Sequence, residues 1–181
     1  DTVLSRGLGD VYKRQDLLRE VAVKSRSHDH EIAKIISIES GKPLIECLDE
    51  IEWIASIFEY YSEIGRDQRG RVVAPVTPRS MSMVVKEAYG VVGCIVPWNY
   101  PLLLMAWKVA PALAAGNTVV VKPSEITPLS IMIWLEKCCS HLPAGVLNMV
   151  TGYGETGAAL VEHPDIRAVS YTHLTLPTSP K

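Results

Sequence analysis

The chain has 181 residues, of which 48% are hydrophobic and 21% are charged, and its formal net charge is −2. This composition is typical of a globular protein of one domain or slightly more, and the charge balance excludes a strongly basic surface for nucleic acid or anionic lipid. No apolar run reaches the roughly 18 residues of a membrane span, and no secretory signal is recognisable. We therefore expect a cytoplasmic protein with neither nucleic acid nor membrane as a partner.

The two ends differ from the rest of the sequence. Residues 1–15 show no clean periodicity, and residues 171–181 are rich in Thr and Pro. Both stretches resemble translated sequencing adapter, although loose chain ends would be the ordinary alternative. We expect them to be non-native tails, with the domain spanning residues 16–170.

The first half of the domain has helical periodicity followed by short alternating runs. A polar interruption at residues 27–30 divides the first helical stretch, which is therefore one amphipathic helix or a pair. Gly41 has the sequence context of a helix C-cap, and Gly65 ends the next helix. The predicted elements are helices at 16–37 and 44–64 and strands at 72–76 and 81–86.

From Gly90 onward, continuous apolar runs alternate with helical patterns through short loops, which predicts β-α-β units and a parallel sheet. Pro111 predicts a bend or split in one helix, and Thr127 predicts an N-cap for another. The predicted strands are 91–96, 118–121, 146–151 and one that begins at 168–169. We expect an α/β fold: a Rossmann-like parallel sheet with flanking helices, preceded by N-terminal helices and a strand pair, and incomplete as a domain.

Ligands of such sheets bind beyond the carboxyl ends of the strands, where two segments carry polar side chains. The Asn99 carboxamide suits either a donor to a developing oxyanion or a helix cap. Lys122 and Glu125 suit either ribose hydroxyls, with Ser124 nearby, or a solvated surface pair. The residues alone leave these alternatives open.

A third segment, residues 152–157, matches G-x-G-x-x-G between a strand and a helix. It follows the third predicted strand rather than the first, and no acidic residue follows at the expected spacing. The alternative is a glycine-rich turn that permits close packing. His28 and His30 lack further ligands at metal spacing, so we predict no metal site. The four cysteines, which we expect to be reduced and buried, also lack this spacing.

Several longer segments together resemble the aldehyde dehydrogenase superfamily over residues 16–170. The segments are 38–43, 90–93 leading into 97–101, 107–117, 121–125 and 143–148. The resemblance implies an oxidoreductase that converts an aldehyde to a carboxylic acid with NAD, or with NADP as the possible alternative. An acidic residue at Glu125 favours NAD because it would repel the 2′-phosphate of NADP.

The resemblance also implies roles for single residues. Asn99 would be the side-chain half of an oxyanion hole, Lys108 would join a charge relay with a distant carboxylate, and Tyr100 and Trp107 would face the aldehyde entrance. The implied cofactor contacts are Val96, Pro97 and Trp98 on the nicotinamide side and Lys122, Pro123, Ser124, Glu125, Gly152 and Gly154 around the adenosine.

The sequence departs from the family pattern near its end. Where the family continues its fourth strand into Phe-Thr-Gly-Ser, this chain runs from Val169 through Thr172 into His173. The regions that supply the family's cysteine nucleophile and glutamate base are also absent, so we expect a fragment that is inactive alone. The parent enzyme is expected to be a homodimer or homotetramer. The competing hypotheses are a nucleotide-binding module that uses residues 152–157 without redox chemistry, and a non-enzymatic protein that oligomerises through residues 72–86.

Overall fold

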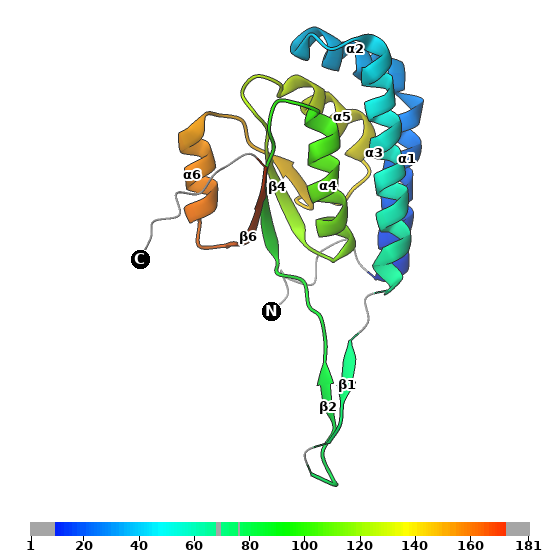
Figure 1. Cartoon of the computed structure of the whole chain (residues 1–181), viewed down its shortest axis with the longest axis vertical. Coiled ribbons are helices and arrows are strands. Elements are labelled where there is room, and N and C mark those ends of the chain that lie inside the picture. The colour runs from blue at the N-terminus through cyan, green and yellow to red at the C-terminus, as the bar shows by residue number, and fades with distance from the viewer. Residues whose placement is uncertain (1–9, 68–69, 76, 173–181) are drawn as a thin grey trace.

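The computed structural model describes residues 10–67, 70–75 and 77–172. In this part of the chain, a layer of helices covers one face of a parallel sheet, one helix lies on the other face, and a two-stranded hairpin projects from the body (Figure 1). Residues 1–9 and 173–181 of the two expected tails lie outside the described residues. The α/β architecture predicted from the sequence is confirmed.

Three helices form the outer layer: α1 (Val11–Ser27), α2 (Asp29–Ser40) and α3 (Leu44–Ile64). The first begins earlier than predicted, because the Asp10 carboxylate accepts a hydrogen bond from the Lys13 backbone N–H at 2.9 Å and so caps the helix. Of the residues assigned to the N-terminal tail, 11–15 therefore form the start of α1. Gly41 ends α2 with a φ of 72°, a left-handed conformation that glycine adopts without strain.

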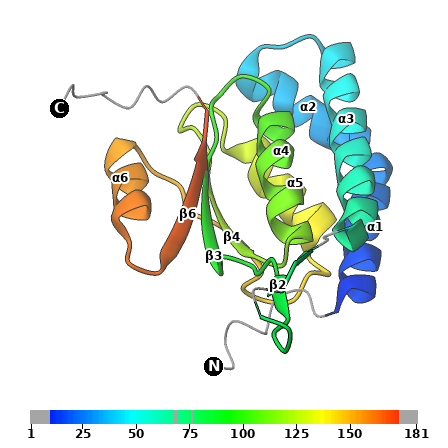
Figure 2. The ribbon, with the colours of Figure 1, turned by 60° about the horizontal axis from the view of Figure 1, so that its bottom comes forward.

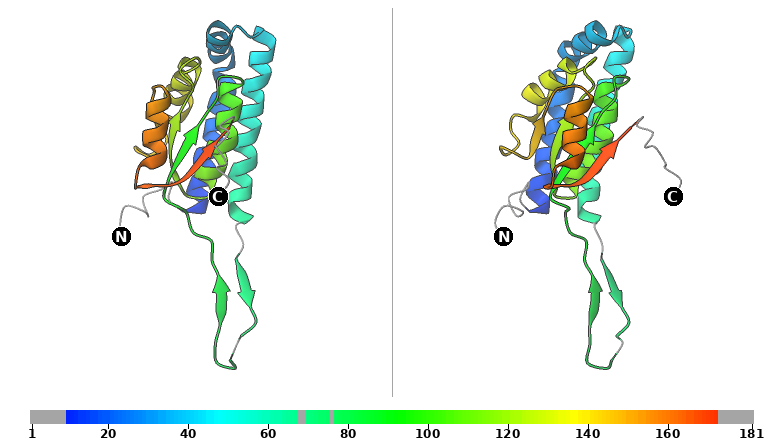
Figure 3. Two further views of the ribbon diagram at one scale, coloured as in Figure 1. Left: turned by 60° about the vertical axis from the view of Figure 1, so that its left-hand side comes forward. Right: turned by 90° about the vertical axis from the view of Figure 1, so that its left-hand side faces the viewer.

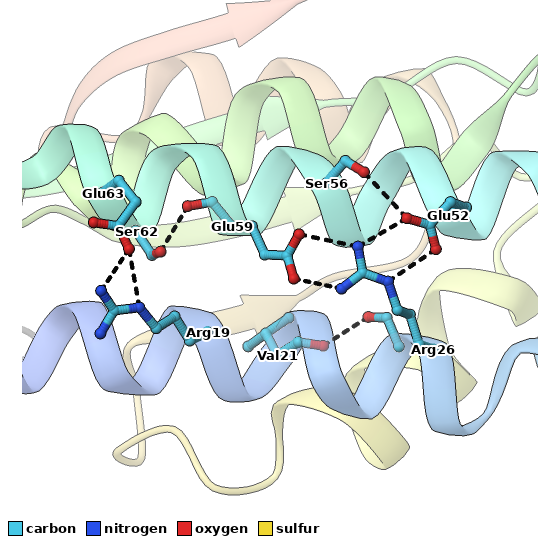
Figure 4. Close-up of polar contacts among 9 residues, drawn as sticks. Arg19, Val21, Arg26, Glu52, Ser56, Glu59, Ser62 and Glu63 are labelled. Carbon is cyan, nitrogen blue, oxygen red and sulfur yellow. Dashed lines mark hydrogen bonds and ion pairs between the residues drawn. The ribbon is translucent and has the colours of Figure 1, made fainter.

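An ion-pair network joins α1 to α3 along their exposed edge (Figure 4). The Arg26 guanidinium donates to both Glu52 and Glu59, and Arg19 donates to Glu63. Hydrogen bonds from Arg26 lower the pKa of the Glu52 and Glu59 carboxyls. Below this edge the two helices bury apolar side chains against each other and the rest of the core, notably Leu18, Val21, Ile51, Ile54 and Phe58.

The central sheet has four parallel strands in the order β5-β4-β3-β6. They are β3 (Val91–Ile95), β4 (Thr118–Lys122), β5 (Leu147–Met149) and β6 (Ile166–Tyr171). One face is covered by α4 (Pro101–Ala114) and α5 (Leu129–Cys139), with α1 and α3 beyond them, and the other face is covered by α6 (Gly154–Glu162) (Figure 2). Short β-α-β crossovers produce this arrangement, as predicted.

Two local features bear on the predictions at Pro111 and Thr127. Of the bend or split predicted at Pro111, the split does not occur, because α4 is continuous through this residue. Thr127 does not cap α5: the cap position is Pro128, which makes no side-chain cap bond. The Glu39 carboxylate, at the end of α2, instead accepts from the Leu129 and Ser130 backbone N–H groups at 2.9 and 3.1 Å.

The strand pair forms a separate antiparallel ribbon of β1 (Arg71–Val73) and β2 (Ser82–Val84), with Arg71 opposite Val84. It extends away from the sheet and helices (Figure 3). The ribbon is shorter than predicted, and Val76 of the first predicted strand lies outside the described residues. No helix in the described ranges is long and apolar enough to cross a membrane.

Candidate functional site

The loops after β3 and β4 start side by side at the carboxyl edge of the sheet. Ile95 is in register with Lys122, and the Val96 backbone N–H donates to the Lys122 carbonyl at 3.0 Å. Further along, the Thr127 hydroxyl donates to the Trp98 carbonyl at 3.3 Å. The segments that contain Asn99 and Lys122 therefore leave neighbouring parallel strands, in the placement that the sequence predicts.

Asn99 does not cap the helix that follows it. The N-cap of α4 is Tyr100, which makes no side-chain cap bond and has a left-handed backbone with φ of 47°. Pro101 occupies the first helical position, where a missing N–H has no consequence. Among the described residues, none makes a hydrogen bond with the half-buried Asn99 carboxamide. Its two N–H donors are therefore available to a ligand.

A buried carboxylate from α3 replaces the missing cap of α4. Glu50 is fully buried, and its Oε1 accepts from the Leu102 and Leu103 backbone N–H groups at 3.0 and 3.1 Å. The Lys42 ammonium donates to Glu50 Oε2 at 2.5 Å and lies 3.8 Å from the centre of the Tyr100 ring. No sequence pattern pointed to the contact of Glu50 with Leu102 and Leu103, because these residues lie 52 and 53 positions apart along the chain.

Lys122 and Glu125 stand at a cleft between β4 and α6. The Lys122 side chain is buried, and its Nζ lies 3.7 Å from Glu125 Oε2, whose side chain is half exposed. The cleft has a volume of about 440 Å³. Its lining residues are Ile95, Lys122, Glu125, Tyr153, Gly154, Gly157, Ala158, Val161 and Glu162. Pro123 is buried, and Ser124 accepts from the Ile126 backbone N–H at 3.3 Å, which holds the turn.

The glycine-rich segment divides into two parts. Gly152 has a φ of 147°, and a Cβ there would lie 2.0 Å from the Thr156 hydroxyl, so glycine is required for packing. Gly154 has open space around its missing Cβ and borders the cleft. Glu155 lies in the first turn of α6, where its charge opposes the binding of an anion. Of the two glycines that were expected to contact the cofactor, Gly154 lines the cleft and Gly152 does not.

Aromatic side chains cluster near the first turn of α4. Tyr100 precedes α4 as its N-cap and Trp107 lies within the helix, and their side chains are 36% and 56% exposed. The Trp53 ring of α3 lies 6.3 Å from the Tyr100 ring. The Trp53 and Tyr100 rings therefore form a partly exposed aromatic pair, of which Tyr100 is next to Asn99 in the chain.

Lys108 follows these aromatic residues on α4 and is half-buried. Its ammonium donates to the Thr172 hydroxyl. Burial lowers the pKa of Lys108, which makes this amine easier to deprotonate than a surface lysine. Within the described residues, Lys108 forms no ion pair with a carboxylate.

The cysteines of the chain are free and buried thiols. Burial raises the pKa of Cys94, in the middle of β3, to about 12, and that of Cys138 to about 11. A thiol is nucleophilic as its thiolate, so these positions do not offer a reactive group. Among the described residues, no group of His, Cys, Asp and Glu side chains could hold a metal ion.

Comparison with known sequences relates this chain to one family. A sequence model described as "Aldehyde dehydrogenase family" matches residues 8–173. Aminoaldehyde dehydrogenase 1, peroxisomal, of Malus domestica is 43% identical over 168 residues, which cover 90% of this chain and 33% of that protein. Betaine aldehyde dehydrogenase 1 of Oryza sativa subsp. japonica is also 43% identical, over 94% of this chain and 34% of that protein. The chain thus spans about a third of the curated relatives that it matches.

Solved structures agree with the sequence matches. A betaine aldehyde dehydrogenase from Staphylococcus aureus in complex with NAD⁺ superposes with a TM-score of 0.87 at 34% identity, over 91% of this chain and 34% of that one. An NADP-dependent enzyme of E. coli gives a TM-score of 0.86 at 35% identity, over 90% of this chain and 34% of that one. The names of relatives include peroxisomal and chloroplastic proteins, so the expected cytoplasmic location stays a prediction.

Proposed function

Because the chain belongs to the aldehyde dehydrogenase family, we propose that it forms the cofactor-binding part of an enzyme that oxidises an aldehyde to a carboxylic acid with NAD(P)⁺. The observation that carries this proposal is the pairing of two loops at one sheet edge. One contains Asn99 with free amide donors, and the other contains Lys122 and Glu125 at a cleft. A bound NAD(P)⁺ would supply the hydride acceptor for this oxidation.

The residues of the cleft fit the adenosine end of a dinucleotide. A ribose diol both donates and accepts hydrogen bonds, and Lys122 supplies donors while Glu125, 3.7 Å away, supplies an acceptor. The volume of about 440 Å³ lies within the range of small-molecule pockets. We assign Pro123, Ser124, Gly152 and Gly154 to the surroundings of this end, although Gly152 acts there through packing. We assign Val96, Pro97 and Trp98 to the nicotinamide end.

Glu125 supports a preference for NAD⁺ over NADP⁺. Its carboxylate would stand beside the 2′ position of the ribose and repel a phosphate there. The Lys122 ammonium lies close enough to offset part of this repulsion, so NADP⁺ remains an alternative cofactor, bound more weakly. Relatives of both kinds are known, one solved with NAD⁺ and one described as NADP-dependent.

Asn99 is proposed to stabilise the substrate oxygen. As negative charge develops on the aldehyde carbonyl, an amide N–H fixed at the start of α4 stabilises that charge, and stabilises it more in a site shielded from water. The nucleophile must come from elsewhere, because all four cysteines are buried and burial raises the pKa of each thiol. Lys108 is proposed to pair with a carboxylate outside the described residues.

The aromatic residues Tyr100 and Trp107 support a cationic aldehyde as the substrate class, with an apolar aldehyde as the alternative. Trp107 on α4 is 56% exposed, so its ring is accessible, whereas the Lys42 ammonium, 3.8 Å from the centre of the Tyr100 ring, already lies against that ring. Aromatic faces attract amino and quaternary ammonium groups. The relatives named for aminoaldehydes and betaine aldehyde belong to this class.

The proposed cofactor site is tested by calorimetric titration of the chain with NAD⁺ and NADP⁺. We expect the unchanged chain to bind NAD⁺ more tightly than NADP⁺. Glu125→Gln should lower the affinity for NAD⁺ and so reduce the difference between the two affinities. Lys122→Met should lower the affinity for both cofactors. Glu136→Gln, an exposed carboxylate on α5, is the matched control and should change nothing. Equal binding by all four proteins would contradict the proposal. The 181 residues alone should not form NADH from an aldehyde, and measurable turnover would show that a nucleophile has been overlooked.

The competing nucleotide module predicts a different pattern. If phosphates bound at residues 152–157, Gly154→Ala would abolish binding while Glu125→Gln would leave it intact. The packing role of Gly152 and the charge of Glu155 favour the ribose site over this alternative.

Subunit contacts are proposed for the β1–β2 ribbon. Its apolar side chains lie far from any core, and several are more than 60% exposed: Val72, Met81, Met83 and Val85. Apolar surface of this kind marks interaction sites, which supports a homodimer or homotetramer of the parent enzyme. Light scattering should report a smaller particle for Val72→Lys with Met83→Lys than for the unchanged chain. An unchanged particle size would remove the ribbon from the interface.

A further inference from the structure

The first turn of α4 is held by side chains from a distant part of the sequence. Glu50 of α3 is fully buried and uses both carboxylate oxygens: Oε1 accepts from the backbone N–H groups of Leu102 and Leu103, and Oε2 accepts from Lys42. Lys42, in the loop between α2 and α3, also places its ammonium over the Tyr100 ring. One buried ion pair thus contacts both the backbone of α4 and the residue that precedes it.

These contacts stabilise a turn with a disfavoured backbone conformation and the helix start that follows it. Tyr100 has a left-handed backbone, which is disfavoured for residues with a Cβ. The helix that follows lacks a side-chain cap of its own, so its first N–H groups would otherwise be buried without partners. Such conformations persist where surrounding contacts fix them. Asn99, next to Tyr100, is itself free of hydrogen bonds to the described residues and depends on its neighbours for its place.

We propose that Glu50 and Lys42 are positioning residues that hold the Asn99–Tyr100 turn in the orientation needed for the reaction. The inference rests on the proposed role of Asn99. Glu50 holds the backbone after the turn through its hydrogen bonds to Leu102 and Leu103, and Lys42 holds the Tyr100 ring through its ammonium. Both residues act through Tyr100 and the backbone of α4.

A second carboxylate supplies a matched control. Glu39 caps α5 as Glu50 caps α4: it accepts from two backbone N–H groups, those of Leu129 and Ser130. Helix α5 follows the Lys122–Glu125 loop, so Glu39 supports the proposed adenosine end and Glu50 the proposed nicotinamide end. Glu39→Gln and Glu50→Gln are therefore the same chemical change at opposite ends of one site.

The first experiment needs no ligand. Amide hydrogen exchange and side-chain amide resonances are measured by NMR on the whole chain for wild type, Glu50→Gln, Lys42→Met, Lys42→Arg and Glu39→Gln. We expect Glu50→Gln to speed exchange at Leu102 and Leu103 about tenfold, as loss of a charge-assisted bond allows, and to shift the Asn99 side-chain resonance. Lys42→Met should shift the same resonance and Lys42→Arg should restore it, which keeps the test valid if Glu50→Gln fails to fold.

The second experiment adds NAD⁺ and records saturation transfer to its nicotinamide and adenine protons. Glu50→Gln should lower the nicotinamide signal relative to the adenine signal, and Glu39→Gln should not. If wild type shows no transfer to either end, the proposed cofactor site is wrong, and the exchange data alone decide the positioning role. The inference would be overturned if the Asn99 side-chain resonance were unshifted in both Glu50→Gln and Lys42→Met. It would also be overturned if Glu50→Gln and Glu39→Gln changed the nicotinamide and adenine signals equally.

Discussion

The Thr127 hydroxyl donates a hydrogen bond to the backbone carbonyl of Trp98, 3.3 Å away, and so ties the loop after β4 to the loop after β3. Thr127 is fully buried, so water does not compete for this bond. The two loops carry the proposed adenosine and oxyanion contacts, which makes their relative placement a condition of the proposed function.

Thr127→Val should therefore weaken both folding and cofactor binding. The substitution keeps the shape of the side chain and removes its donor, which leaves the Trp98 carbonyl without this partner, at a cost of about 1–3 kcal/mol. The free energy of unfolding is measured with urea, and NAD⁺ affinity by calorimetry. Thr118→Val is the control, because its hydroxyl makes only a 3.5 Å contact with the Gly90 carbonyl, away from the site. Equal NAD⁺ affinity in the two variants would show that this bond does not align the loops.

Gly152→Ala should destabilise the protein, and Gly154→Ala should not. A Cβ at position 152 would lie 2.0 Å from the Thr156 hydroxyl, and the φ of 147° disfavours any side chain, whereas a Cβ at position 154 meets open space. Forced overpacking of this kind typically costs about 1–3 kcal/mol. Thermal unfolding of both variants gives the comparison, and similar melting temperatures would contradict the packing role of Gly152.

Cys94 should make the protein less stable at alkaline pH. Burial raises the pKa of its thiol from the ordinary 9.0 to about 12, so between these values the unfolded chain has lost a proton that the folded chain retains. Stability therefore falls as pH rises above about 9, and the fall ends near the folded pKa. Cys94→Ala should show a shallower decline of unfolding free energy from pH 9 to 11. Parallel curves for the two proteins would mean that the thiolate is tolerated inside the sheet.

Arg26 should contribute to the loss of stability in acid. It holds the pKa values of Glu52 and Glu59 below the ordinary 4.5, so the contribution is present above that pH and is lost as these carboxylates protonate below it. Because the side chains are about half exposed, the effect at neutral pH is at most about 1 kcal/mol. Arg26→Ala should flatten the stability profile below pH 4.5, while Arg19→Ala, on the same edge (Figure 4), serves as the comparison. If the unfolding free energy of Arg26→Ala fell as steeply below pH 4.5 as that of the unchanged chain, the ion-pair network would not be the cause of the loss of stability in acid.

The sequence predicted the elements well because their signals are local. Helix α3 spans Leu44–Ile64 as its periodicity and the following Gly65 indicate, and the buried apolar runs gave the parallel strands. The contacts of Glu50 and Glu39 could not be predicted, since they join residues 52 and 90 positions apart. Asn99 looked equally suited to a cap and to a ligand donor. Backbone geometry was needed to show that Tyr100 takes the cap position instead.

The proposed function depends most on the claim that Lys122 and Glu125 hold the ribose of a nicotinamide dinucleotide beside the Asn99 loop. Saturation-transfer NMR of the chain with NAD⁺, compared between wild type, Glu125→Gln and Glu136→Gln, tests it directly. We predict transfer to the adenine and ribose protons in wild type and Glu136→Gln, and a marked loss in Glu125→Gln. Undiminished transfer in Glu125→Gln, or none in wild type, would contradict the claim.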